Sequence, residues 1–191
     1  MTDQRTYGFI GLGQMGGPMA DNIAKAGLPV HVYDAAGTKD RAHEKAIAHD
    51  SLAGVLANAD TVFLSLPDGP ICTTVAKEIV QVNDRKTSVV IDLSTIGLAA
   101  AQDIDKIFTD AEITYIDAPV SGGRKGAIAG TIAIMGSGPK DVFDAHMDVF
   151  KAFAKNPFHV GETPGQGQVV KMLNNFLSAT ATTATTEAVL F

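Results

Sequence analysis

The 191-residue sequence has no tryptophan, a single cysteine and no excess of basic residues. Cys72 alone can form neither an intrachain disulfide nor a cysteine-rich metal site, which fits a reducing compartment and predicts a cytoplasmic location. The net charge of −6 and the lack of a basic run argue against a nucleic-acid partner. No run reaches the roughly 18 apolar residues of a membrane span, and no apolar leader follows Met1. The five histidines show no metal-ligand spacing, so no metal site is predicted.

What is present indicates a folded globular protein, because 46% of the residues are hydrophobic and 19% are charged. The length suits one domain with residues to spare. Glycine accounts for 19 of the 191 residues, more than the usual fraction of about 7%. The positions of these glycines are therefore informative.

Apolar runs alternate with helical patterns along the chain. Predicted strands cover residues 7–10, 29–33, 61–66, 88–91, 114–116, 131–135 and 158–160. Predicted helices cover residues 18–26, 40–48, a short segment capped by Ser51, 71–80, 98–108 and 139–153, and one long helix begins near Gly165.

This alternation with short connections predicts an α/β fold. We expect a Rossmann-type, doubly wound and mainly parallel sheet, followed by the start of a long connecting helix. Residues 1–162 would form a dinucleotide-binding domain and residues 163–191 the beginning of the long helix. Ligands of such sheets bind at the carboxyl ends of the strands, where this sequence places its Gly-rich and polar segments.

The first motif is Gly11-x-Gly13-x-x-Gly16, between a predicted strand and a predicted helix. Gly11 would make the tight turn, Gly13 would let backbone amides approach a pyrophosphate, and Gly16 would let the helix pack on the strand. Asp34 ends the next strand, eighteen residues after Gly16, where it can accept hydrogen bonds from a ribose. A Gly-rich turn with a capping Asp and no ligand is the simpler alternative.

The Asp34 carboxylate also bears on the choice of dinucleotide. It would repel a 2′-phosphate, and neither Ala35 nor Ala36 offers a compensating positive charge. NAD is therefore favoured over NADP, although Lys39 and Arg41 are near enough in sequence to keep NADP as the weaker alternative.

Two later motifs contain polar groups suited to a small acid. In the segment 117–123, the backbone amides of Gly122 and Gly123 beside the Ser121 hydroxyl form a possible carboxylate site, or simply a tight turn. In the segment 165–175, Lys171 and Asn175 share one helix face, with Gly167 one turn earlier leaving space for a small substrate. A desolvated lysine can act as a general acid or base, whereas a lone exposed one is a solvated side chain.

In order, these motifs resemble the β-hydroxyacid dehydrogenase family, which includes 3-hydroxyisobutyrate dehydrogenase and has a cofactor domain of the 6-phosphogluconate dehydrogenase type. Residues 8–20 resemble its cofactor signature, 117–123 with 126–130 its substrate signature, and 165–175 its catalytic helix. Family members continue for roughly another hundred residues as a helical domain, so the chain is expected to be truncated before that domain.

The resemblance implies a role for each matching residue. Lys171 would be the general acid/base of a hydride transfer between nicotinamide and a small β-hydroxy acid, and Asn175 would orient the substrate. Ser121, Gly122 and Gly123 would hold the substrate carboxylate. The cofactor residues would be Gly11, Leu12, Gly13, Gln14, Met15, Gly16 and Asp34, with Leu66, Pro67 and Thr95 along the nicotinamide half.

Other functions stay open at this point. Without the helical domain the 191-residue chain is expected to be weakly active or inactive, so a dinucleotide-binding or interaction module without catalysis is the alternative from another class. An imine reductase is less favoured, because such enzymes usually carry Asp or Tyr where Lys171 stands. The exposed end of the long helix predicts a homo-oligomer.

Overall fold

The computed structural model describes residues 5–191, and the statements that follow concern this part of the chain. It contains nine strands: β1 (Tyr7–Ile10), β2 (Val30–Tyr33), β3 (Ile47–Ala48), β4 (Thr61–Leu64), β5 (Val89–Asp92), β6 (Thr114–Asp117), β7 (Val120–Ser121), β8 (Ile132–Ser137) and β9 (Ala154–Gly161). It contains eight helices: α1 (Gly16–Lys25), α2 (Leu52–Leu56), α3 (Gly69–Gln81), α4 (Leu98–Thr109), α5 (Gly123–Ala129), α6 (Lys140–Asp144), α7 (Met147–Phe153) and α8 (Gln166–Leu190).

All strands belong to one sheet, in the order β3-β2-β1-β4-β5-β6-β8-β7, with β9 also paired to β8. Pairing is parallel from β3 to β6 and between β8 and β9, and antiparallel where β8 meets β6 and β7. The strand order reverses between β1 and β4, which is the position where doubly wound sheets form a ligand crevice. The predicted fold class is confirmed.

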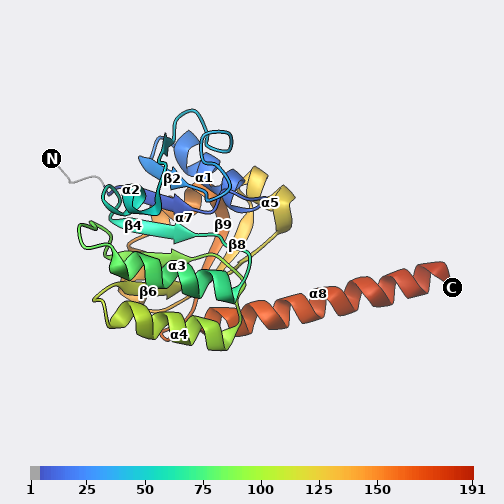
Figure 1. Ribbon diagram of the computed structural model, residues 1–191. Coiled ribbons are helices and arrows are strands. Elements are labelled where there is room, and N and C mark those ends of the chain that lie inside the picture. Colours follow the sequence, from blue (N-terminus) through green and yellow to red (C-terminus); the bar gives the residue numbers. More distant parts are fainter. Residues whose placement is uncertain (1–4) are drawn as a thin grey trace.

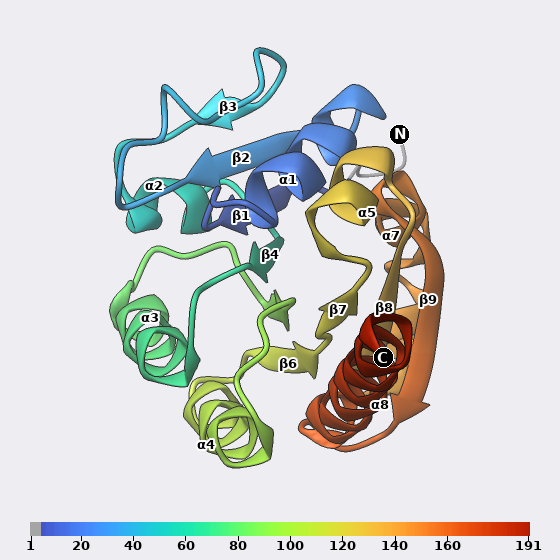
Figure 2. The same cartoon turned by 90° about the vertical axis from the view of Figure 1, so that its right-hand side faces the viewer.

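Helices cover both faces of the sheet (Figures 1 and 2). One apolar core lies between the sheet and α1, α5, α6 and α7, with Phe63, Phe150 and Phe153 in mutual aromatic contact. The other lies under α2, α3 and α4, where Ile79 and Phe108 are fully buried. Because both faces are covered, the central strands are apolar without alternation.

The predicted helix at residues 40–48 is wrong. The chain makes turns there, in which the Arg41 and Ala42 N–H groups donate to the Thr38 carbonyl, and then forms β3 beside β2. A helix this short is marginal without an apolar face to bury. Pairing with β2, extended by the bond from the His49 N–H to the Val32 carbonyl, gives the backbone other partners.

The single helix predicted at residues 139–153 is two helices, α6 and α7. His146 lies between them, 2% exposed, and its Nδ1 donates to the Val142 carbonyl at 2.7 Å. That carbonyl would otherwise accept the His146 backbone N–H in a continuous helix, and the N–H bonds Phe143 instead. The Nε2 atom contacts Thr61 Oγ1 at 2.8 Å, so a buried contact to β4 sets the break.

Three other boundaries differ from prediction. β9 is eight residues long and follows α7 without a loop, whereas only residues 158–160 were expected as strand. The short β7 and the helix α5 were missed. β7 has only two residues, too few to show an alternating pattern, and α5 contains Gly123 and Gly126, which carry little helix propensity.

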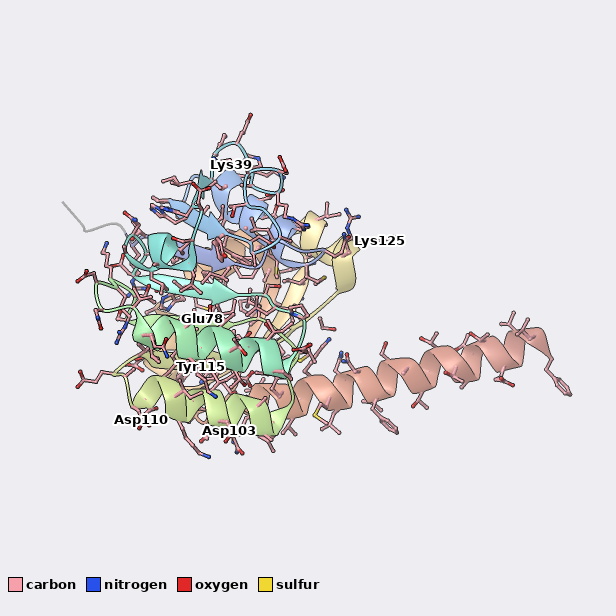
Figure 3. All side chains as sticks on the ribbon, viewed as in Figure 1. Lys39, Glu78, Asp103, Asp110, Tyr115 and Lys125 are labelled. Carbon is pink, nitrogen blue, oxygen red and sulfur yellow. The ribbon has the colours of Figure 1, made fainter. Side chains whose placement is uncertain are left out.

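The predicted long helix is present as α8, 25 residues in length. Its first turns contact β6, β8, β9 and α4, and the rest projects away from the sheet (Figure 1). Side chains along this outer part point away from the rest of the molecule (Figure 3). The apolar Met172, Phe176 and Leu177 on α8 are exposed. Self-association through these side chains stays a prediction. Within residues 5–191, no helix has the length and apolar character needed to span a membrane.

Candidate active site

A cleft of about 930 Å³ lies at the carboxyl ends of the central strands. It runs from Asp34 at the end of β2 to Lys171 on α8, past the loop between β1 and α1. Most of the predicted site residues line it: Gly11, Gly13, Gln14, Met15, Gly16, Asp34, Leu66, Pro67, Thr95, Gly123, Lys171 and Asn175. Leu12, Ser121 and Gly122 do not.

The glycine loop has the geometry that its spacing predicts. Gly11 has φ of +93°, and a Cβ there would collide with the Ser65 carbonyl of the neighbouring strand end. A Cβ on Gly16 would collide with the Gly11 carbonyl, so this glycine permits α1 to begin against β1. At Gly13, by contrast, a Cβ would meet nothing within 4 Å, because the residue faces the open cleft.

The amino end of α1 opens into this cleft without a capping side chain and without an acidic residue in its first turn. Backbone N–H groups at such an end carry partial positive charge and attract anions. Together with the open face of Gly13, this end of the cleft fits a phosphate-bearing ligand.

Asp34 connects the loop to the end of β2. Its Oδ2 accepts the Leu12 N–H at 2.6 Å, and its Oδ1 accepts the Ala36 N–H at 2.8 Å. A carboxylate has about four acceptor positions, so capacity remains for a ribose hydroxyl. Arg41 Nε lies 3.9 Å from Oδ1. The Leu12 side chain itself is 4% exposed in the core, so Leu12 contributes its amide and not its side chain.

Apolar residues that the sequence analysis did not single out complete the wall of the cleft. Ile71 and Val75 on α3 are four residues apart on one helix face and line the cleft, as does Glu78 one turn further along the helix. Tyr33 and Leu52 also line the cleft. Such a surface fits a flat ring. Ile71 is 40% exposed although it is apolar and lies on an amphipathic helix, and this exposed apolar surface distinguishes the wall of the cleft.

Lys171 lies at the other end, on the first part of α8. Its side chain is 9% exposed, and burial lowers its pKa from the ordinary lysine value. Within residues 5–191 it makes no hydrogen bond and no ion pair, so its amine is free to face the cleft. Asn175, one turn later, also lines the cleft and is exposed. A lysine with lowered pKa at a cleft is suited to proton transfer.

The Ser121 region lies beside this helix. Ser121 Oγ accepts from Asn174 Nδ2 at 3.1 Å, a partner that the sequence analysis missed. Gly122 and Gly123 have φ of +134° and +61°, conformations that side chains other than glycine rarely adopt. Gly123 also begins α5 and lines the cleft. The turn therefore requires glycine at both positions, and of the two only Gly123 lines the cleft.

Gly167 does not have its predicted place. Instead of leaving space in the cleft, it is buried at the contact of α8 with β8 and β6, and a Cβ there would collide with the Met135 carbonyl and approach Asp117. Asp117 is fully buried, and burial raises its pKa to about 6 against the hydrogen bonds from Gln168 that lower it. The sequence did not predict that Gln168 is buried here or that it bonds Asp117.

Residues 6–161 match a protein family described as the NAD binding domain of 6-phosphogluconate dehydrogenase. The chain is 38% identical to 2-(hydroxymethyl)glutarate dehydrogenase of Eubacterium barkeri over 89% of its length, and 34% identical to 3-hydroxyisobutyrate dehydrogenase of Pseudomonas aeruginosa over 98%. It spans 58% and 63% of these two relatives.

Two solved structures also resemble this chain. A 3-hydroxyisobutyrate dehydrogenase of Mycobacterium tuberculosis, described with L-serine, superposes with a TM-score of 0.90 at 33% identity, covering 97% of this chain and 64% of that one. An imine reductase of Myxococcus stipitatus described with NAD+ has a TM-score of 0.86 at 19% identity, covering 97% and 64%. The second likeness shows the fold alone.

Proposed function

Because this chain belongs to the family of the NAD binding domain of 6-phosphogluconate dehydrogenase, we propose that it binds a nicotinamide dinucleotide and serves in the oxidation or reduction of a small β-hydroxy acid. The observation that carries the proposal is the cleft that joins an anion-binding helix end and Asp34 to a buried lysine with lowered pKa.

The dinucleotide would lie along the cleft from Asp34 to Lys171. The loop amides around Gly13 and the amino end of α1 would hold the pyrophosphate, and Asp34 would accept from the adenosine ribose. Leu66, Pro67 and Thr95 line the part of the cleft that would take the nicotinamide.

NAD is favoured over NADP in this proposal. The Asp34 carboxylate is 12% exposed at the side chain and would oppose a 2′-phosphate. The Arg41 guanidinium lies beside the same carboxylate, which partly offsets its positive charge.

At the other end, the chain's own groups would position the substrate and move its proton. The backbone amide of Gly123, which lines the cleft, with the adjacent Gly122 amide and Ser121 hydroxyl would hold the carboxylate, and Asn175 would orient the hydroxyl. In oxidation the neutral Lys171 amine would take the hydroxyl proton, and in reduction its ammonium would return it. A bound nicotinamide supplies the two-electron change at the carbinol carbon.

The names of the relatives support small β-hydroxy acids as the substrate class. The names of two of them refer to 3-hydroxyisobutyrate and 2-(hydroxymethyl)glutarate, which share a carboxylate and a nearby hydroxyl. Since these relatives are longer than this chain, groups outside these 191 residues can contribute to substrate choice in them.

The test is calorimetric titration of the chain with NAD and with NADP, followed by turnover measurements with both hydroxy acids. Their methyl esters serve as matched controls without the carboxylate. We expect tighter binding of NAD than of NADP, and slow turnover of the free acids only. NAD binding without turnover would identify a dinucleotide-binding module without catalysis, and binding of neither dinucleotide would overturn the proposal.

A further inference from the structure

Helix α8 begins without a cap of its own. Its N-cap residue is Gly165, with φ of +99° and no side chain to accept the first free N–H groups. The acceptor comes from another part of the chain: Asp117 Oδ2, at the end of β6, accepts the Gly165 N–H at 3.1 Å and the Gln168 N–H at 3.0 Å. The start of the helix is therefore fixed to the central sheet by a buried carboxylate.

The Gln168 side chain adds four more connections and is fully buried. Its Oε1 accepts the N–H groups of Ile96 and Gly97, at 2.9 and 3.0 Å, in the loop before α4. Its Nε2 donates to the Ser94 carbonyl at 3.0 Å and to Asp117 Oδ1 at 2.6 Å. One amide thus joins α8 to the ends of both β5 and β6, using both donors and both acceptor positions.

Lys171 depends on this attachment for its position. It lies three residues after Gln168, about one turn along the same helix. Its side chain has no hydrogen bond or ion pair among residues 5–191, so its location follows from the placement of α8. Thr95, which lines the nicotinamide part of the cleft, directly precedes Ile96, whose N–H binds Gln168.

We propose that Gln168, held by Asp117, is a positioning residue that sets the Lys171 amine against the Thr95 end of the cleft. The proposal rests on the proposed function for its catalytic meaning, but the placement of the amine can be measured without turnover. Gln168 does not line the cleft, so it acts through the helix and not by touching a ligand. A displacement of about 1 Å at such a site can cost about 10²-fold in rate.

The first variant is Gln168→Met, which keeps the length of the side chain and removes its four hydrogen bonds. Gln166→Met is the matched control, because Gln166 is exposed in the same first turn and its side chain makes one hydrogen bond, to the Thr163 N–H. We expect Gln168→Met to lower kcat about 10- to 100-fold, with Kd for NAD unchanged within about twofold. The control should change neither.

The second variant, Gln168→Glu, distinguishes positioning from simple loss of stability. The introduced carboxyl group, when protonated, offers one carbonyl and one O–H and can replace much of the amide pattern, whereas its ionised form opposes the Asp117 carboxylate. The ratio of variant to wild-type kcat should rise as the pH falls. The same ratio for Gln168→Met should stay low at every pH.

The readout that needs no turnover is the pH dependence of Lys171 acetylation by acetic anhydride, followed by mass spectrometry. In Gln168→Met, where the Lys171 amine would leave its buried position, the pH midpoint of acetylation should rise toward that of an exposed lysine. In Gln166→Met it should stay at the wild-type value. A wild-type midpoint and wild-type kcat in folded Gln168→Met would overturn the positioning role.

Two further outcomes are separable. If Gln168→Met does not fold, the Gln168→Glu variant decides the question. A ratio of its kcat to the wild-type kcat that does not change with pH would overturn the positioning role. Absence of wild-type turnover would count against the proposed function, while the acetylation midpoints would still decide this inference.

Discussion

The two ends of the cleft are built in different ways. We call the Asp34 end the dinucleotide end, because the proposed function places the pyrophosphate and the adenosine ribose there. Its glycine loop and Asp34 belong to one strand-helix-strand unit, and the bond from the Leu12 N–H to Asp34 spans 22 residues. At the lysine end, Gln168 bonds Asp117 and Ser94 across 51 and 74 residues, and Asn174 bonds Ser121 across 53. A local unit can be recognised from spacing, whereas a site assembled from separate segments depends on how the sheet brings them together.

The largest expected effect is at the lysine end. Lys171→Met should lower kcat for β-hydroxy acid oxidation by about 10²- to 10⁴-fold, the usual contribution of a general acid or base. Kd for NAD should stay within about twofold, because the dinucleotide end is intact. Steady-state kinetics and calorimetry measure the two quantities, with the exposed Lys155→Met as control.

The pH profile sharpens this first prediction. Burial lowers the pKa of Lys171, so wild-type oxidation should rise with pH to a midpoint below that of an exposed lysine, as the neutral amine forms. Reduction should fall over the same pH range, since it needs the ammonium. If oxidation and reduction do not show this opposite pH dependence, Lys171 does not transfer the proton.

The next effect is at the dinucleotide end. Asp34→Ala should raise Kd for NAD about 10- to 100-fold, since hydrogen bonds to a charged group contribute about 1.5–3 kcal/mol. Kd for NADP should rise less, because the repulsion of the 2′-phosphate is removed as well. Titration with both dinucleotides tests this against Asp40→Ala, an exposed carboxylate in the same loop. An unchanged ratio of the two Kd values would contradict the assigned NAD preference.

A pair of glycines compares the two ends directly. Gly167→Ala should lower the free energy of unfolding by about 1–3 kcal/mol, the range for overpacked sites, because its Cβ would collide with β8. Gly13→Ala should leave stability nearly unchanged, since its Cβ meets open space, and raise Kd for NAD about tenfold, near 1.4 kcal/mol. Urea unfolding and calorimetry of both variants test this. The reverse pattern would show that the two glycines have been assigned the wrong roles.

The smallest effect concerns Asn174, which donates to Ser121 Oγ at 3.1 Å. Asn174→Ala should raise KM for the hydroxy acid about 2- to 10-fold, in line with the roughly 0.5–1.5 kcal/mol of one hydrogen bond. Its kcat should change little, because Lys171 stays in place. The exposed Asn83→Ala is the control. Equal KM values for wild type and Asn174→Ala would show that this hydrogen bond does not contribute to substrate binding.

The features that local spacing predicts, and those that it does not, divide in the same way. Spacing placed the Gly-rich loop, Asp34, Lys171 and Asn175 in one cleft. It misassigned Gly167 and missed Gln168, because the partners of both residues lie on strands and loops far away in the sequence. It also joined α6 and α7 into one helix, since nothing in the local pattern shows that His146 binds Thr61 across 85 residues.

The sequence by itself determined the parallel α/β fold, the glycine turn between β1 and α1, and the candidate lysine helix. These features depend on local conformation, such as φ above zero at Gly11 and the one-turn separation of Lys171 and Asn175. Only the tertiary structure decided how α8 is attached, because its cap is a buried carboxylate from β6 and its anchor is an amide that joins separate segments. Burial requires each of these polar groups to find a partner, and the partners exist only after the sheet has formed.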